Sequence, residues 1–147
     1  MHGDMPNDGG EWGDPIERLQ EFIRSAGIDA EVVFPSGPTS TVVEAAATLG
    51  VPATQIVKSL LFETRQGEYL LVIASGERRI SRPRLADASS LTDLKLARPE
   101  TVLGVTGFAV GGMPPVGHDV RLMVVVDRAV MEQPIVFGGG GRTDAVL

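Results

Sequence analysis

Two apolar segments separated by a short polar turn constrain the fold of this 147-residue chain more than any other feature. Residues 55–62 (QIVKSLLF) and residues 69–74 (YLLVIA) are short, apolar and rich in strand-forming side chains. The segment between them, ETRQGE, is polar and contains a glycine. Apolar strands joined by such a turn are typical of an antiparallel β-hairpin. The sequence therefore predicts a hairpin in the middle of the chain.

Capping signals predict two helices in the first third of the chain. Asp14 followed by a proline is typical of a helix start, and Gly27 is expected to end that helix. Thr41 and Glu44 form a capping box that begins a second helix, which Gly50 is expected to end. Shorter helices are expected at residues 82–88 and from Pro99 onward.

Further strands are predicted where valine and other strand-forming residues cluster, at 30–34, 121–127, 134–138 and 144–147. Because strands dominate the middle and end of the chain and helices its first third, the sequence predicts an α+β fold with a mixed sheet. Residues 1–13 are predicted to form a flexible N-terminal tail, and residues 14–147 a single domain. The chain stops inside the last predicted strand, so we expect it to be truncated at its C-terminal end.

Composition excludes several classes of site. The chain has no cysteine, and its two histidines, His2 and His118, do not have the spacing of metal ligands. No glycine-rich segment ends in the Gly-Lys-Ser/Thr of a phosphate-binding loop. We therefore expect neither a metal nor a cofactor. Without a bilayer-spanning apolar run or a secretory signal, the default expectation is a cytoplasmic protein with no membrane contact.

The charge distribution leaves two interpretations open. A net charge of −6 argues against extensive contact with nucleic acid, which requires clustered Lys and Arg. However, residues 78–84 (RRISRPR) carry four arginines. This arginine patch, formed by Arg78, Arg79, Arg82 and Arg84, is either a solvated turn or a local site for a polyanion such as tRNA.

One lysine contradicts the apolar pattern of the predicted hairpin. Strand alternation places Lys58 on the same face as Ile56, Leu60 and Phe62, where an ammonium group is costly unless it reaches water or a partner. Lys58 could be a structural lysine that extends to the rim of the sheet, a nucleophile with a lowered pKa, or a fixed cation that positions an anionic or carbonyl group. Its apolar setting and the glycine loop described next favour the third role.

The glycine loop, residues 106–120 (TGFAVGGMPPVGHDV), is the second candidate for chemistry. Gly111 and Gly112 carry no side chain and the prolines hold the backbone rigidly, so backbone N–H groups can approach a carbonyl oxygen. The alternative is a plain connection in which the glycines only supply positive φ. His118 lies beside the proposed site, although its simplest interpretation is a surface loop residue.

Five segments in this order resemble the YbaK family, the editing domains associated with prolyl-tRNA synthetase, which include free-standing aminoacyl-tRNA deacylases. They are TVVEAAATLGVPATQIVKSLLF, YLLVIASGERRI, TGFAVGGMPPVGH, MVVVD and VFGGGGR. The resemblance extends from about Ile16 to the C-terminus. Its most specific parts are the Ile-Val-Lys-Ser strand and the Gly-x-x-x-Pro loop from Gly111 to Pro115.

The resemblance implies a mixed, strongly curved and partly barrel-like sheet flanked by helices. It also implies hydrolysis of the ester that joins a wrong amino acid to the 3′ end of a tRNA. Lys58 would bind the substrate near the scissile ester, and backbone groups of Gly111 and Pro115 would line the pocket. Further positions expected to contact or shape the substrate site, by the resemblance or by their place in or beside the loop, are Thr41, Ser59, Gly112, His118, Gly138 and Asp144.

Two functions remain open at this point. The first is a trans-editing hydrolase for a small amino acid such as Ala, Ser or Cys, with the acceptor end of tRNA, and a synthetase, as partners. The second is a non-catalytic module that binds an aminoacyl or nucleotide ligand, or a synthetase, in the same pocket. No general base is evident in the sequence, so the nucleophile of a hydrolase would be a water or a ribose hydroxyl.

Overall fold

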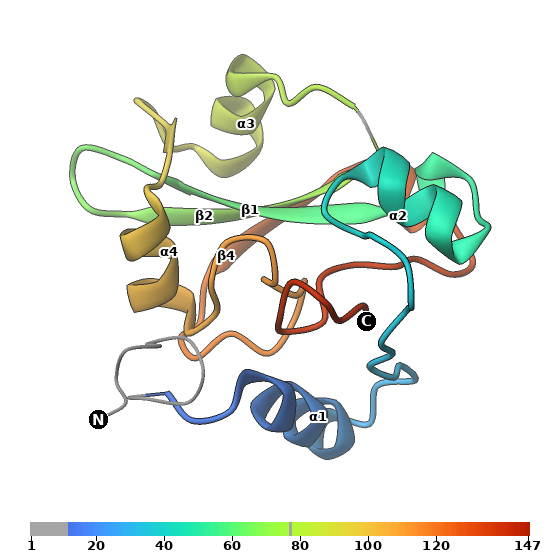
Figure 1. The fold of residues 1–147 in the computed structure, drawn as a ribbon. Coiled ribbons are helices and arrows are strands. Elements are labelled where there is room, and N and C mark those ends of the chain that lie inside the picture. The colour runs from blue at the N-terminus through green and yellow to red at the C-terminus, as the bar shows by residue number, and fades with distance from the viewer. Residues whose placement is uncertain (1–11, 77) are drawn as a thin grey trace.

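A four-stranded mixed sheet with the strand order β3-β1-β2-β4 forms the centre of the molecule (Figure 1). The structure is a computed structural model that describes residues 12–76 and 78–147. The predicted hairpin is confirmed, because β1 (Val57–Glu63) and β2 (Tyr69–Ser75) are antiparallel neighbours. The predicted tail, residues 1–13, lies almost entirely outside the described residues.

Two shorter strands extend the sheet on its two sides. β4 (Met123–Val126) lies parallel to β2, since the chain crosses over through α3 (Arg82–Ser89) and α4 (Pro99–Thr106) before it returns. β3 (Lys95–Leu96) is antiparallel to β1, but it pairs only with the last two residues of that strand. The predicted α+β fold with a mixed sheet is therefore confirmed.

The helix starts predicted from caps are also confirmed. α1 (Pro15–Ala26) begins after Asp14, whose side chain accepts a hydrogen bond from a backbone N–H of the first turn. α2 (Val42–Leu49) begins after Thr41 and ends at a left-handed Gly50. Among the residues with assigned structure, no helix is long and apolar enough to cross a membrane.

The sheet has an apolar core on each face. Odd-numbered residues of the hairpin, such as Leu61 and Leu71, pack with residues of α1 and α4. Even-numbered residues, such as Phe62 and Leu70, pack with Leu85 of α3. Figure 1 shows α1 and α3 on opposite sides of the sheet. Each strand residue of β1 therefore belongs to either the α1 face or the α3 face.

Three predicted strands are wrong, and three short elements were not predicted. Residues 30–34, 134–138 and 144–147 make only isolated bridges, between Val33 and Val146, Ile56 and Phe137, and Gly139 and Val146. For residues 134–138 and 144–147 the glycines between them explain the difference. A Cβ at Gly139 would lie 2.4 Å from the backbone oxygen of Met113, and one at Gly140 would lie 2.6 Å from the carbonyl carbon of Ala145, so the chain does not continue as a regular ladder. The elements not predicted are the 3-10 helix η1 (Ala53–Gln55), β3 and α5 (Arg128–Met131).

Candidate functional site

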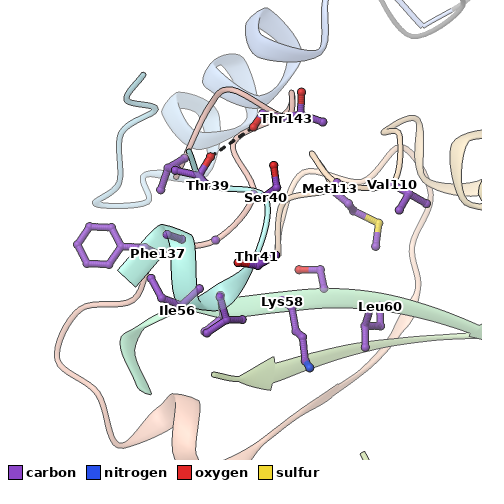
Figure 2. A pocket seen from close by; sticks show the side chains of 18 of the residues that line it. Thr39, Ser40, Thr41, Ile56, Lys58, Leu60, Val110, Met113, Phe137 and Thr143 are labelled. Atoms are coloured by element: carbon purple, nitrogen blue, oxygen red, sulfur yellow. Dashed lines mark hydrogen bonds between the residues drawn. The ribbon is translucent and has the colours of Figure 1, made fainter. Parts of the chain in front are cut away.

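A cavity of about 360 Å³ lies along the outer edge of β1 (Figure 2). Its walls come from α2 and the residues before it (39–49), from residues 56–61, from residues 96–102 of β3 and α4, from the glycine loop and from the C-terminal segment (residues 137–146). Apolar side chains make up most of the lining. Among the described residues that line it there is no Asp, Glu, His or Cys, and Lys58 is the one ionisable side chain.

The cavity lies along the edge of β1 that faces away from β2, at a stretch where no other strand pairs with this edge in the described structure. Before this stretch, the backbone N–H of Val57 donates to the oxygen of Phe137 at 2.8 Å, and after it the N–H of Ala97 donates to the oxygen of Leu61 at 2.9 Å. Odd-numbered residues of β1 therefore direct their backbone groups outward, and Ser59 lies midway between the two contacts. Within the described chain, no hydrogen-bond partner is recorded for the backbone N–H or C=O of Ser59.

This open edge explains how neighbouring side chains of β1 can border one cavity. In a regular strand Lys58 and Ser59 lie on opposite faces. Both line the cavity because it is at the edge of the strand and meets both faces. No bulge in β1 is needed, and the pairing of β1 with β2 continues without interruption from Val57 to Glu63.

Lys58 is half-buried and its amino group is directed away from the loop side of the cavity. Figure 2 shows this amino group on the side of β1 opposite to Ser40 and Met113, with the side chain of Leu60 extending the same way. In the described part of the structure Lys58 has no ion-pair partner. The stem of the lysine thus packs at the cavity and its charge remains available to a ligand.

Ser59 combines the open backbone edge with an unpaired hydroxyl. Its Oγ is buried and has no hydrogen-bond partner among the described residues. Most buried polar groups in proteins are hydrogen-bonded, so an orphan hydroxyl next to a cavity is unusual. A ligand with a polar group would satisfy it.

Hydroxyl groups that the sequence analysis did not select border the cavity near the start of α2. They belong to Thr39, Ser40 and Thr143, beside the predicted Thr41. Thr41 accepts a hydrogen bond from the N–H of Glu44 at 3.0 Å, and Thr39 donates to the backbone oxygen of Thr143 at 3.4 Å. Thr41 therefore acts first as a helix cap, with its exposed edge at the cavity. The polar residues before a helix start were the only sequence signal for this rim.

The Gly-x-x-x-Pro loop contributes only part of its length to the cavity. Gly111, at φ 94°, and Met113 line it, whereas Gly112 is buried behind them and accepts a hydrogen bond from the N–H of Gly141 at 2.8 Å. Pro115 does not line the cavity but packs against Gly138, where an added Cβ would lie 3.2 Å from the proline ring. The loop is thus held by the glycine-rich C-terminal segment.

His118 lies outside the cavity and supports the loop from behind. Its Nε2 is 2.8 Å from the backbone oxygen of Pro114, and its ring packs edge-on against Phe108. Burial lowers the pKa of His118 below its ordinary value, and the hydrogen bond to Pro114 opposes this only partly. The histidine borders a second, shallow hollow beside α1.

The remaining predicted residues divide into one that lines the cavity and several that do not. Gly138 lines it beside Phe137. Asp144 is exposed and forms a two-pronged ion pair with Arg142, with N···O distances of 2.9 and 2.7 Å, which lowers the pKa of its carboxyl. The four residues of the arginine patch are exposed and do not line the cavity. Among them, Arg78 pairs with Asp127 at 3.2 Å.

Comparison with known proteins identifies the family. The model of the aminoacyl-tRNA editing domain matches residues 36–147. Proline--tRNA ligase from Thermotoga sp. (strain RQ2) is 36% identical over 110 residues, which are 75% of this chain and 18% of that protein. The corresponding ligase from Pelotomaculum thermopropionicum is 34% identical over 108 residues, 73% of this chain and 18% of that protein. The chain therefore spans about a fifth of the length of these curated relatives.

A solved structure agrees with this assignment over most of both chains. It is described as "a putative trans-editing enzyme for prolyl tRNA synthetase", and it superimposes with a TM-score of 0.81 at 34% identity. The superposition covers 90% of this chain and 83% of the other. The resemblance inferred from the sequence motifs is thereby confirmed. The chain belongs to the aminoacyl-tRNA editing domain family.

Proposed function

We propose that this protein is a trans-editing hydrolase that removes a small amino acid, such as Ala, Ser or Cys, from mischarged tRNA. The observation that carries this proposal is the cavity at the β1 edge, which combines an apolar interior, a rim of hydroxyls and one cation. Its volume of about 360 Å³ is near the lower end of ligand pockets, which hold about 300–1,000 Å³. A cavity of this size favours a small side chain on the ester.

Hydrolysis of an aminoacyl ester requires few catalytic side chains. In the hydrolysis, a water oxygen bonds to the ester carbonyl carbon, the bond from that carbon to the ribose oxygen breaks, and the ribose oxygen receives a proton. An activated ester needs mainly the placement of its nucleophile and the stabilisation of the developing oxyanion. Among the described residues that line the cavity, none carries a carboxylate or imidazole that could act as base. We therefore propose that the water is positioned by the rim or by a hydroxyl of the terminal ribose.

The two sets of cations have different proposed roles. Lys58 lies at the border of the cavity with its amine free, so it would hold the 3′-terminal nucleotide through charge-assisted hydrogen bonds. The exposed arginine patch would contact phosphates farther along the tRNA. Because the net charge is −6, we expect this contact to be weak unless a synthetase assists it.

That the described lining residues include no general base also favours a second candidate. A non-catalytic module could bind an aminoacyl or nucleotide ligand, or a synthetase, in the same cavity without turnover. Such a protein would be stabilised by the ligand against unfolding. It would release no amino acid from any charged tRNA.

A deacylation panel with a matched lysine control tests the proposal. tRNA charged with Ala, Ser or Cys would be incubated with the wild type, with Lys58→Ala and with Lys95→Ala. The chain has two lysines, and Lys95 is exposed on β3 outside the cavity. We expect Lys58→Ala to lose roughly 10²–10³-fold in rate while Lys95→Ala keeps the wild-type rate. A folded Lys58→Ala protein with full activity would refute the role of Lys58.

A further inference from the structure

We propose that the aminoacyl group docks on the open edge of β1 as a one-residue extension of the sheet, paired with Ser59. In this arrangement the backbone N–H of Ser59 donates to the ester carbonyl oxygen, and the backbone C=O of Ser59 accepts from the α-ammonium group. The inference rests on the proposed function, because it takes an aminoacyl ester as the ligand. It adds main-chain recognition at a residue whose backbone has no partner in the described structure.

The pairing pattern leaves a gap of suitable length. Phe137 pairs with the β1 edge at Ile56, and β3 begins its ladder at Phe62. Between these contacts, Ser59 is the residue whose backbone N–H and C=O both point outward without a hydrogen-bond partner in the described structure. The cavity lies against this stretch, so a small ligand can reach it.

An aminoacyl ester carries the complementary groups in the required order. In a hydrogen-bonded antiparallel pair, each residue donates its N–H to the other's C=O and accepts in return. The α-ammonium and the carbonyl of an amino acid ester are separated by one Cα, as they are in a strand residue. An analogue that lacks the α-amino group cannot make both bonds.

The same donor would contribute to catalysis. When the nucleophile bonds to the carbonyl carbon, negative charge develops on the oxygen that the N–H of Ser59 contacts. A backbone donor already fixed in a strand needs no reorganisation at that moment. The pairing with β2 holds this N–H in place, because Lys58 and Leu60 on either side pair with Ala74 and Val72.

The register also predicts where the substrate side chain would lie. Paired residues of antiparallel strands place their side chains on the same face of the sheet. The substrate side chain would therefore lie on the α1 face, beside the buried and unpaired Oγ of Ser59. Val57 and Leu61 flank Ser59 on this face and would limit the length of the side chain.

Amide hydrogen exchange measured by NMR tests the docking directly. The probes are 3′-deoxy-3′-(alanylamino)adenosine, an amide that the esterase chemistry does not remove, and its propionylamino analogue, which lacks the α-amino group. In the free protein we expect the Ser59 amide to exchange faster than the amides of Lys58 and Leu60, which pair with β2. Saturation with the alanylamino probe should slow Ser59 at least about tenfold and leave the other two nearly unchanged. The propionylamino probe should bind roughly 10-fold more weakly.

Two variants provide a second readout. Ser59→Pro removes the outward N–H, which has no ladder bond to lose, whereas Ser59→Ala keeps it. We expect deacylation to fall about 10²-fold more in Ser59→Pro than in Ser59→Ala. If Ser59→Pro does not fold, the hydrogen-exchange measurement on the wild type still tests whether the ligand docks at Ser59.

The outcomes separate this inference from the proposed function. Four results would each overturn the docking at β1. They are slow exchange of the Ser59 amide in the free protein, no slowing of its exchange by a saturating alanylamino probe, equal binding of both probes, and binding of neither probe. Deacylation of a mischarged tRNA together with any of these results would leave the proposed function standing. Slowed exchange at Ser59 without turnover of any charged tRNA would support the docking and refute the hydrolase.

Discussion

The contact between the C-terminal glycines and the Gly-x-x-x-Pro loop should control both stability and rate. A Cβ added at Gly139 would lie 2.4 Å from the backbone oxygen of Met113 and 2.9 Å from its carbonyl carbon. To reach 3.0 Å the Met113 oxygen has to move by at least 0.6 Å, the difference between 3.0 and 2.4 Å. The φ of Gly139 is not in the left-handed region, so Gly139→Ala perturbs the protein through this contact and not through backbone strain.

We expect Gly139→Ala to destabilise the protein by about 1–3 kcal/mol, as overpacking generally does. Because Met113 and Gly139 both line the cavity, we also expect deacylation to fall. Misplacement of a site by about 1 Å can lower a rate by as much as 10²-fold, so a shift of this size should cost on the order of 10-fold or more. Denaturant unfolding and single-turnover deacylation of alanyl-tRNA measure the two effects.

Gly104 offers a matched control. It lies in α4, and a Cβ there would meet nothing within 4 Å. Gly104→Ala should therefore stabilise the protein by up to about 1 kcal/mol through helix propensity, with no change in rate. A Gly139→Ala protein as stable and as active as Gly104→Ala would show that the loop and the C-terminal segment are not coupled through this contact.

Three further results are expected. Ser59→Ala should leave the free energy of unfolding unchanged or raise it by about 1 kcal/mol, because it removes a buried unpaired hydroxyl, and a large loss in denaturant unfolding would contradict this. Burial lowers the pKa of His118 in the folded protein, so below its ordinary pKa the unfolded chain binds more protons and Tm should fall as pH decreases through about 6.5. His118→Gln can still donate a hydrogen bond to Pro114 and should reduce this dependence of Tm on pH. Replacing Arg82 and Arg84 with Gln should lower the salt dependence of tRNA binding by about one unit for each phosphate that is no longer neutralised, and an unchanged slope would exclude the arginine patch.

Local signals in the sequence were sufficient for the hairpin and the helix starts. The β1–β2 pair is joined by a short turn, and the caps at Asp14 and Thr41 act within one helical turn, so neighbouring residues determine them. The strands predicted at 134–138 and 144–147 failed for the opposite reason. Gly139, which lies between them, packs against the distant backbone of Gly112 and Met113, and only isolated bridges form where the sequence pattern predicts strands.

The candidate site was predictable only in part. Lys58, Ser59, Thr41, Gly111 and Gly138 were selected from the sequence, and all of them line the cavity. The orientation of the Lys58 amine and the role of His118 behind the loop depend on long-range packing. The open edge at Ser59 depends on two pieces of chain that are distant in the sequence. Residues 95–96 were not predicted as a strand, and the strand predicted around Phe137 gave no indication that it would contact β1. No local pattern around residue 59 could have revealed it.

An exposed strand edge is ordinarily a liability, because it can pair with another chain and promote aggregation. At β1 the open stretch is confined between Phe137 on one side and β3 on the other, and it lies inside a cavity. A strand of several residues would collide with both neighbours, whereas a single amino acid fits between them. The two short contacts that close β1 therefore make the edge selective by length. Extending the β3 ladder by three antiparallel pairs, from Phe62 to Ser59, should block substrate binding. An extended β3 that retains full deacylation would show that the substrate does not use this edge.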